Sequence, residues 1–300
     1  MKLFVSGLVN RETVVPVKSF PIQYFPIDYP FFKVNTSTAG VGFNVAKALT
    51  TLGDDVQFFS YTGNDAEGKC IDEELRENNI STEFIQKELK ATASSVVLYD
   101  GAGKRQVYCD LKDVQDVKTA LTDEIQESIK RADLICACNI NFSREILRYA
   151  VKHSKTIATD VHVLNDIHDA YNKEFMANVS ILFLSDENVP CNEADFILQL
   201  AEEYKNLKII VLGQGSKGAS LYERINNKIV QFQSCKPTKI VNTVGAGDAL
   251  FSCFIHFYAK GKTPEECLSL AQKFAAIKIG SDGAAKGFVD EKTLKITSVL

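Results

Sequence analysis

The stretch NTVGAGDALFSC, residues 242–253, places three small residues and one aspartate directly before an apolar run. The run continues as ALFSCFIHFYAKG, which is typical of a buried helix that ends near Gly261. We therefore expect the residues GAG at 245–247 to lie at the helix N-terminus, after a strand formed by TKIV at 238–241. Free backbone N–H groups and the helix dipole make such a terminus suitable for an anion.

Asp248 at this terminus has two interpretations that the stretch alone leaves open. Its carboxylate can stabilise the helix, because an acidic side chain in the first turn favours the helix dipole. A fixed negative charge, however, repels a bound phosphate. A carboxylate and an anion site work together when the carboxylate removes a proton from a hydroxyl while the amides stabilise a transferring phosphoryl group.

A second glycine-rich stretch, STAGVGFNVAKALTTLG at residues 37–53, also runs from a loop into a helix. We expect Asn44 to cap this helix and Gly53 to end it. The spacing does not fit a dinucleotide-binding loop, because its third small position is Val45 and a polar segment precedes it. The glycines indicate either close contact between the main chain and a small polar ligand or a tight loop without one.

Short apolar runs alternate with amphipathic segments along the rest of the chain. The apolar runs are predicted to be buried strands, and the amphipathic segments, such as 66–78, 143–153 and 264–279, are predicted to be helices. This pattern predicts an α/β fold, namely a three-layer, doubly wound, mostly parallel sheet with helices on both faces.

Two regions depart from this alternation. Residues 11–36 and 93–111 are extended in character, and we expect them to form a small β-sheet lid with a hairpin turn at 100–104. The sequence contains no long linker or internal repeat, so residues 1–300 are expected to form a single domain.

Composition excludes several classes of function. A net charge of −4 argues against a nucleic acid or an anionic membrane as the main partner. The apolar runs are too short to cross a membrane, and the first residues do not resemble a signal peptide. Eight cysteines without a CxxC pair indicate reduced, buried thiols in a cytoplasmic protein, and the four histidines form no zinc-like cluster.

The two glycine-rich stretches together resemble the signatures of the ribokinase-like, or PfkB-type, family of carbohydrate and nucleoside kinases. The first matches at Ala39, Gly40, Gly42, Asn44, Ala46, Gly53 and Gly63. The second matches the family pattern D-T-x-G-A-G-D, except that Asn242 stands in place of the first Asp. The motifs lie in the family's order near opposite ends, so the resemblance covers essentially the whole chain.

The resemblance implies roles for individual residues. Asp248 is similar to the family's catalytic base, which deprotonates the acceptor hydroxyl as it attacks the γ-phosphate of ATP. The amides of Gly245, Ala246 and Gly247 are implied to form the anion hole. The residues implied on the acceptor side are Asn10, Glu12, Gly40, Val41, Gly42 and Asn44. The residues implied on the nucleotide side are Ser185, Thr243, Gly215, Lys217, Gly218, Gly283 and Ala284.

The chain departs from the family pattern on the acceptor side. Glu12 stands where ribokinases have Asp, and Val41 and Phe43 replace smaller or polar residues. The pocket is therefore expected to differ from one built for ribose.

The metal side departs as well. The family's N-x-x-E motif, which helps to organise Mg²⁺, should fall at SDEN, residues 185–188. Asp186 and Glu187 are either Mg²⁺ ligands acting through water or solvated residues at the start of a helix. Asn242 and Val244 leave a monovalent-cation site open.

Three further residues have open roles. Asp160 and His162 lie at a predicted strand end, where ligands bind in open α/β sheets. An aspartate at such a position more often has a structural role, and a histidine there is more often a hydrogen-bonded polar residue than a catalyst. Arg105, in the expected lid hairpin, is either part of a solvated turn or a substrate contact.

The sequence therefore predicts an ATP-dependent, Mg²⁺-requiring kinase that phosphorylates a hydroxyl of a small sugar. A nucleoside kinase remains the alternative, and a non-catalytic sugar or nucleotide sensor is the rival from another class. The apolar lid suggests a homodimer formed through it, and the expected partners are small molecules, not nucleic acids or membranes.

Overall fold

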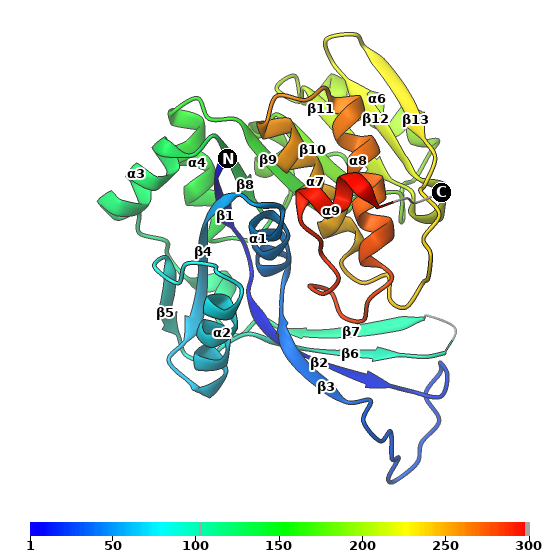
Figure 1. Cartoon of the computed structure of the whole chain (residues 1–300). Helices are drawn as coiled ribbons and strands as arrows, with labels where there is room; N and C mark the ends of the chain where they lie inside the picture. The colour runs from blue at the N-terminus through cyan, green and yellow to red at the C-terminus, as the bar shows by residue number, and fades with distance from the viewer. Residues whose placement is uncertain (102–103, 298–300) are drawn as a thin grey trace.

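The computed structural model describes residues 1–101 and 104–297, and its centre is a nine-stranded sheet between two layers of helices (Figure 1). The strand order is β13-β12-β11-β10-β9-β8-β1-β4-β5, and all neighbours are parallel except β11–β12 and β12–β13. The strands are β1 Lys2–Ser6, β4 Asp55–Gly63, β5 Ile85–Leu89, β8 Leu134–Ala137, β9 Ile157–Val163, β10 Ile181–Ser185, β11 Ile209–Gly213, β12 Ala219–Glu223 and β13 Lys228–Phe232.

Helices cover both faces of this sheet, which confirms the predicted three-layer α/β fold. One core lies under α1 (Val41–Leu52), α2 (Ala66–Glu77), α7 (Ala246–Ala259), α8 (Pro264–Lys278) and α9 (Glu291–Ile296). The other lies under α3 (Asp123–Arg131), α4 (Ser143–Lys152), α5 (Lys173–Asn178) and α6 (Glu193–Glu203).

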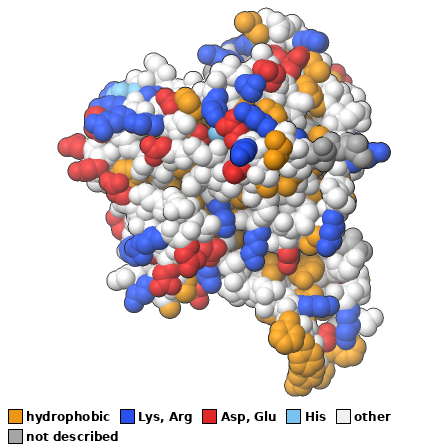
Figure 2. Space-filling model, viewed as in Figure 1, with side chains coloured by type: hydrophobic (Ala, Val, Ile, Leu, Met, Phe, Trp, Pro, Cys, Tyr) orange, Lys and Arg blue, Asp and Glu red, His pale blue; other side chains and the backbone are white. Residues whose placement is uncertain are grey.

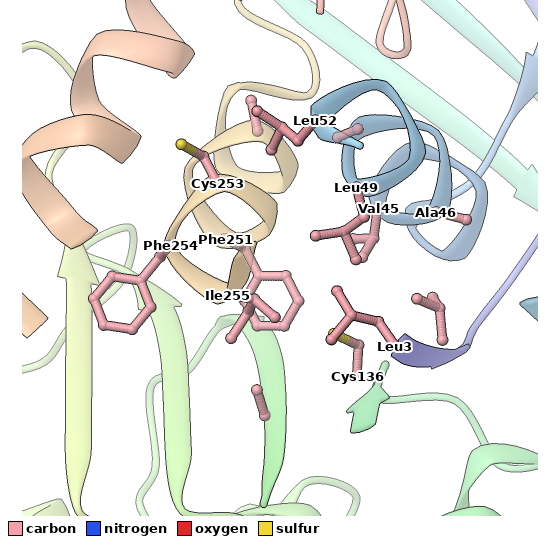
Figure 3. Close-up of a cluster of buried hydrophobic side chains, with 14 of the residues drawn as sticks. Leu3, Val45, Ala46, Leu49, Leu52, Cys136, Phe251, Cys253, Phe254 and Ile255 are labelled. Carbon is pink, nitrogen blue, oxygen red and sulfur yellow. The ribbon is translucent and has the colours of Figure 1, made fainter. Parts of the chain in front are cut away.

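The side-chain alternation of the strands divides the two cores. In β1, Leu3 and Val5 belong to the α1–α7 side and Phe4 to the opposite side, because successive side chains of a strand point to opposite faces. Helices α1 and α7 lie side by side on the first face, with Val45 and Leu49 directed toward Phe251 (Figure 3). This contact joins the two glycine-rich stretches of the sequence.

A separate four-stranded sheet projects from the carboxyl edge of the main sheet (Figure 1). Its order is β3-β2-β6-β7, with β2 (Asn10–Pro16), β3 (Asn35–Ala39), β6 (Ser94–Tyr99) and β7 (Arg105–Asp110). Strands β6 and β7 fall within the predicted lid segment 93–111. The other predicted segment, 11–36, is displaced from the strands, because β2 begins at Asn10 and β3 extends to Ala39. Residues 102–103 of the predicted hairpin turn lie outside the described residues, and 17–34 form a long excursion without strands.

Several local predictions were wrong. The residues TKIV at 238–241 are not a strand; they form an irregular segment whose Val241 N–H donates to the carbonyl of Ile279. Asn44 does not cap α1, because the helix begins three residues earlier at Val41 and Asn44 is buried within it. Phe43, expected in a pocket wall, lies in the core. Of the eight cysteines only Cys136, Cys138, Cys253 and Cys267 are buried.

The sequence analysis also missed the antiparallel β12–β13 hairpin that follows β11. In the part of the chain that the structure describes, no helix is both long and apolar enough to cross a bilayer.

Close backbone packing at Gly42 positions α1. A Cβ on Gly42 would lie 2.4 Å from the carbonyl carbon of Gly7, just beyond β1, so even one methyl group cannot be accommodated without moving the helix. We expect Gly42→Ala to lower the free energy of unfolding by about 1–3 kcal/mol, measured by thermal and denaturant unfolding.

Gly213→Ala is the matched control, because its Cβ would meet only the carbonyl of Leu184 at an ordinary 3.7 Å. This variant should unfold at the wild-type temperature or slightly above it. Equal stability of the two variants would contradict the packing role of Gly42.

Candidate active site

A cleft of about 450 Å³ lies where the carboxyl ends of the central strands meet the N-terminus of α7 and the second sheet. Asp160 and His162 from β9 and Ser185 from β10 form its floor. Glu12 and Arg105 reach it from the second sheet. Binding at the carboxyl edge is the general rule for open parallel sheets, because loops from several strands converge there.

The N-terminus of α7 forms one wall of this cleft. Gly245 is the N-cap at φ +79°, and its missing side chain is required because a Cβ would lie 2.3 Å from the carbonyl oxygen of Ala284. The N–H of Ala246 donates to the carbonyl of Thr243 at 3.2 Å. Of the three amides predicted to form the anion hole, those of Gly245 and Gly247 donate to no backbone carbonyl among the described residues, whereas that of Ala246 does. The N–H of Asp248 is free of a backbone bond as well, so the amides of Gly247 and Asp248 in the first turn of α7 are both available as donors.

The Asp248 side chain is buried at this wall and lines the cleft. Its Oδ2 accepts a hydrogen bond of 2.6 Å from Asn44 Nδ2 of α1. Burial raises the pKa of Asp248 above its ordinary value, an effect that the neighbouring His162 and the Asn44 hydrogen bond oppose and Asp160 reinforces. A carboxyl group with a raised pKa is a stronger base than an exposed aspartate.

A chain of polar side chains faces Asp248 from the second sheet. Asn10 Nδ2 donates to Ser95 Oγ at 2.9 Å, and Ser95 Oγ donates to Glu12 Oε2 at 3.3 Å. Burial raises the pKa of Glu12, and the negative charge of Asp248 adds to this, while Ser95 and Arg105 oppose it. The Oδ1 atoms of Asn10 and Asn44 are buried without a hydrogen-bond partner. Neither residue is part of the cleft lining, so their predicted contact with an acceptor stays a prediction.

The glycines at the start of α1 pack against the backbone of the segment that follows β1. Val41 lines the cleft, and its predicted contact with the acceptor stays a prediction. The close approach allowed by Gly42 is to Gly7, and that allowed by Gly40, at φ +102°, is to the carbonyl of Leu8. Both glycines therefore have a packing role, and their contact with a ligand stays a prediction.

Only some of the residues predicted on the nucleotide side line the cleft. Ser185, Thr243, Gly215 and Gly218 line the cleft. Lys217, Gly283 and Ala284 lie outside its lining; the ammonium of Lys217 is 4.0 Å from Glu193 Oε1.

The candidate metal ligands are sparse. Glu187 and Asp160 line the cleft, whereas Asp186 lies outside its lining and its N–H donates to the carbonyl of Gly213. No group of three His, Cys, Asp or Glu side chains among the described residues could enclose a metal ion. This donor set still fits Mg²⁺, because that ion is usually held by one or two carboxylates together with phosphates and water.

Two contributors to the site were not assigned a role from the sequence. His162 lies at φ +61° beside a register irregularity between β9 and β10, which turns it into the cleft. Lys278, at the end of α8, is fully buried behind the α7 N-terminus and donates to the carbonyl of Val244. The sequence did hold a signal for Lys278, because a lysine within the apolar run FAAIKIG is unusual.

Comparison with known proteins agrees with this geometry. The chain is 24% identical over 313 residues to a ribokinase from Dictyostelium discoideum, and the match covers 95% of this chain and 96% of the relative. Its fold is similar to a microbiome-derived acarbose kinase, with a TM-score of 0.87, 23% identity and coverage of 98% and 97% of the two chains. It is also similar to an Arabidopsis thaliana ribokinase complexed with ribose and ATP, with a TM-score of 0.81, 21% identity and the same coverage.

The family comparison covers nearly the whole chain. Residues 2–291, which include both glycine-rich stretches and the cleft they form, match the pfkB family of carbohydrate kinases. The chain belongs to the pfkB carbohydrate kinase family and is a phosphotransferase of the sugar and nucleoside kinase group.

Proposed function

We propose that the protein transfers the γ-phosphoryl group of ATP to a hydroxyl of a small sugar. The observation that carries this proposal is the position of Asp248, a buried carboxylate with a raised pKa beside the free amides of Gly247 and Asp248. A helix that only needed a stabilising charge would not require its carboxylate to be buried in a cleft.

In the proposed reaction, the carboxylate of Asp248, the free amides of α7 and the bound Mg²⁺ each have a separate role. Asp248 takes the proton of the acceptor hydroxyl, and the resulting oxygen forms a bond to the γ-phosphorus as the bond to the β–γ bridging oxygen breaks and ADP leaves. The α7 amides and helix dipole stabilise the negative charge that moves across the phosphoryl group. Mg²⁺, when bound with ATP, would neutralise phosphate charge, and Glu187 and Asp160 are the carboxylates placed to hold it.

The acceptor side favours a polyhydroxylated ligand. Glu12 and the unpaired Oδ1 atoms of Asn10 and Asn44 are hydrogen-bond acceptors on the two elements that flank Asp248. Sugar hydroxyls supply the matching donors, and leaving buried acceptors unpaired would cost binding energy, so this set discriminates against apolar alcohols.

A nucleoside is the second candidate acceptor. Val41, Val97 and Val107 line the same cleft and provide an apolar surface against which a base could pack. A free sugar would leave that surface in contact with water.

We propose a homodimer formed through the second sheet and a cytoplasmic location. Residues 22–34 carry a cluster of exposed apolar side chains at the tip of that sheet, seen in orange at the lower right of Figure 2. Its members are Ile22, Tyr24, Phe25, Ile27, Tyr29, Phe31, Phe32 and Val34. Apolar patches of this kind mark interaction surfaces. The free thiols are compatible with a reducing compartment.

The proposed activity is tested by coupled ADP release with MgATP across a panel of pentoses, hexoses and nucleosides. We expect turnover with at least one small sugar, and a nucleoside-only response would favour the second candidate. Asp248→Asn should reduce kcat at least about 1,000-fold because it removes the base, while ATP affinity measured by calorimetry stays unchanged. Retained turnover in Asp248→Asn would overturn the proposed mechanism. If the wild type released no acceptor-dependent ADP with any compound, the proposed activity would be overturned.

The pH dependence of turnover should depend on the hydrogen bond from Asn44. Asp248 acts as a base only when deprotonated, so kcat should fall as the pH drops through its raised pKa, above the ordinary value of 3.8. Asn44→Leu removes a donor that stabilises the carboxylate, so the acid limb should move to higher pH by about 1 unit. Asn178→Leu is the control, because the Asn178 amide donates to the carbonyl of Glu174 and neither residue lines the cleft. This variant should leave the acid limb of the pH profile in place. If the acid limb of the kcat profile stayed at the wild-type pH in Asn44→Leu, the assignment of that limb to Asp248 would be wrong.

Light scattering tests the proposed dimer. We expect the wild type to have twice its monomer mass, and Tyr24→Ser with Phe32→Ser to produce monomers because both exposed rings are lost. Ile225→Ser, at an equally exposed apolar residue between β12 and β13, should leave the dimer intact. A monomeric wild type at assay concentration would remove the proposal.

A further inference from the structure

Lys278 is a buried cation next to the segment that leads into α7, the helix that carries Asp248. Its side chain has no exposed surface, and its Nζ donates to the backbone carbonyl of Val244. Burying an ammonium group costs several kcal/mol unless it is paired, so a lysine here needs a compensating interaction. Val244 immediately precedes Gly245, the N-cap of α7.

The segment held by Lys278 is joined to the loop after α8 at several points. The N–H groups of Val241 and Asn242 donate to the carbonyl of Ile279 at 2.8 and 3.2 Å. Asn242 Nδ2 donates to Asp282 Oδ1 at 3.2 Å, and Asn242 Oδ1 accepts from the N–H of Val244 at 2.8 Å. The ammonium of Lys278 therefore lies at the junction of the two loops that shape the α7 N-terminus.

The charges around Lys278 keep it protonated at neutral pH. Burial lowers its pKa to about 8, and Arg105 of the second sheet adds to this decrease. Asp248 of α7 and Asp282 of the loop after α8 act in the opposite direction. The group therefore carries most of a positive charge below pH 8, close to the place where phosphoryl charge would develop.

We infer that Lys278 is a positioning residue for phosphoryl transfer, whose ammonium holds the Val244 carbonyl and takes the place of a bound monovalent cation. This inference rests on the proposed function. The hydrogen bond fixes the peptide just before the N-cap, and so fixes where the free amides of Gly247 and Asp248 point. An alkali cation bound at the same carbonyl oxygen would lie next to this ammonium, and the two positive charges would repel each other.

Kinetics of two lysine variants on the same helix test this role. Lys278→Met removes the charge but keeps an apolar stem in the buried site, and we expect kcat to fall about 100-fold with the KM for the acceptor changed less than about threefold. Lys273→Met is the matched control, because the Lys273 ammonium contacts the carbonyl of Lys295 away from the cleft, and it should keep the wild-type kcat. Wild-type kcat in Lys278→Met would overturn the inference.

Cation rescue separates this role from a general packing effect. Turnover of the wild type should be the same, within about twofold, in choline, sodium and potassium salts. Lys278→Ala leaves a cavity beside the Val244 carbonyl that is large enough for a small cation, so ethylammonium or K⁺ should restore part of kcat, whereas choline is too large to do so. A wild type that requires K⁺, or a Lys278→Ala variant that no small cation rescues, would refute the inference.

Amide hydrogen exchange distinguishes failure of this inference from failure of the proposed function. If the wild type phosphorylates no acceptor, the proposed function fails, but exchange at residues 242–248 still reports on the loop. We expect faster exchange there in Lys278→Met than in the wild type or Lys273→Met. Equal exchange in all three proteins would overturn the positioning role.

Discussion

The hydrogen bond between Asn44 and Asp248 is the interaction on which the rest of the site depends. It spans 2.6 Å between residues 204 positions apart, and it forms because α1 and α7 pack side by side on one face of the main sheet. Apolar contacts such as that of Val45 with Phe251 bring the two helix N-termini together at the carboxyl edge (Figure 3). The amide then stabilises the ionised form of a carboxyl group that burial alone would keep protonated to a higher pH.

The second sheet completes a site that the main sheet leaves open. The main sheet and α7 supply the carboxylate and free amides, while Glu12 and Arg105 come from β2 and β7 across the cleft. Because Glu12 and Arg105 lie on a sheet that projects from the main sheet, movement between the two sheets would change access to Asp248, and closure of the cleft would exclude water. The same sheet carries the exposed apolar residues of 22–34, so the proposed dimer contact and the residues that reach the cleft from this side lie on one structural unit.

Backbone contacts without room for a side chain set the positions of both helix N-termini. Gly42 lies against Gly7 below α1, and Gly245 lies against Ala284 below α7. At neither position can a methyl group be added without displacing the helix or the adjacent loop, so the distance from Asn44 to Asp248 is held from both sides. Lys278 adds a charge to this packing at the segment before Gly245.

The sequence by itself determined the alternating strands and helices, the layered sheet, and the two motifs that contain Asn44 and Asp248, because hydrophobic periodicity and helix-terminus chemistry are local. It was wrong where a local signal competed with distant packing. TKIV is apolar enough for a strand, yet its backbone pairs with the loop after α8, and Asn44 looks like a cap but is turned toward Asp248 inside α1. Only the tertiary structure decided that His162 and the cation of Lys278 belong near this site, and which amides remain free, because these depend on contacts between segments far apart in the chain.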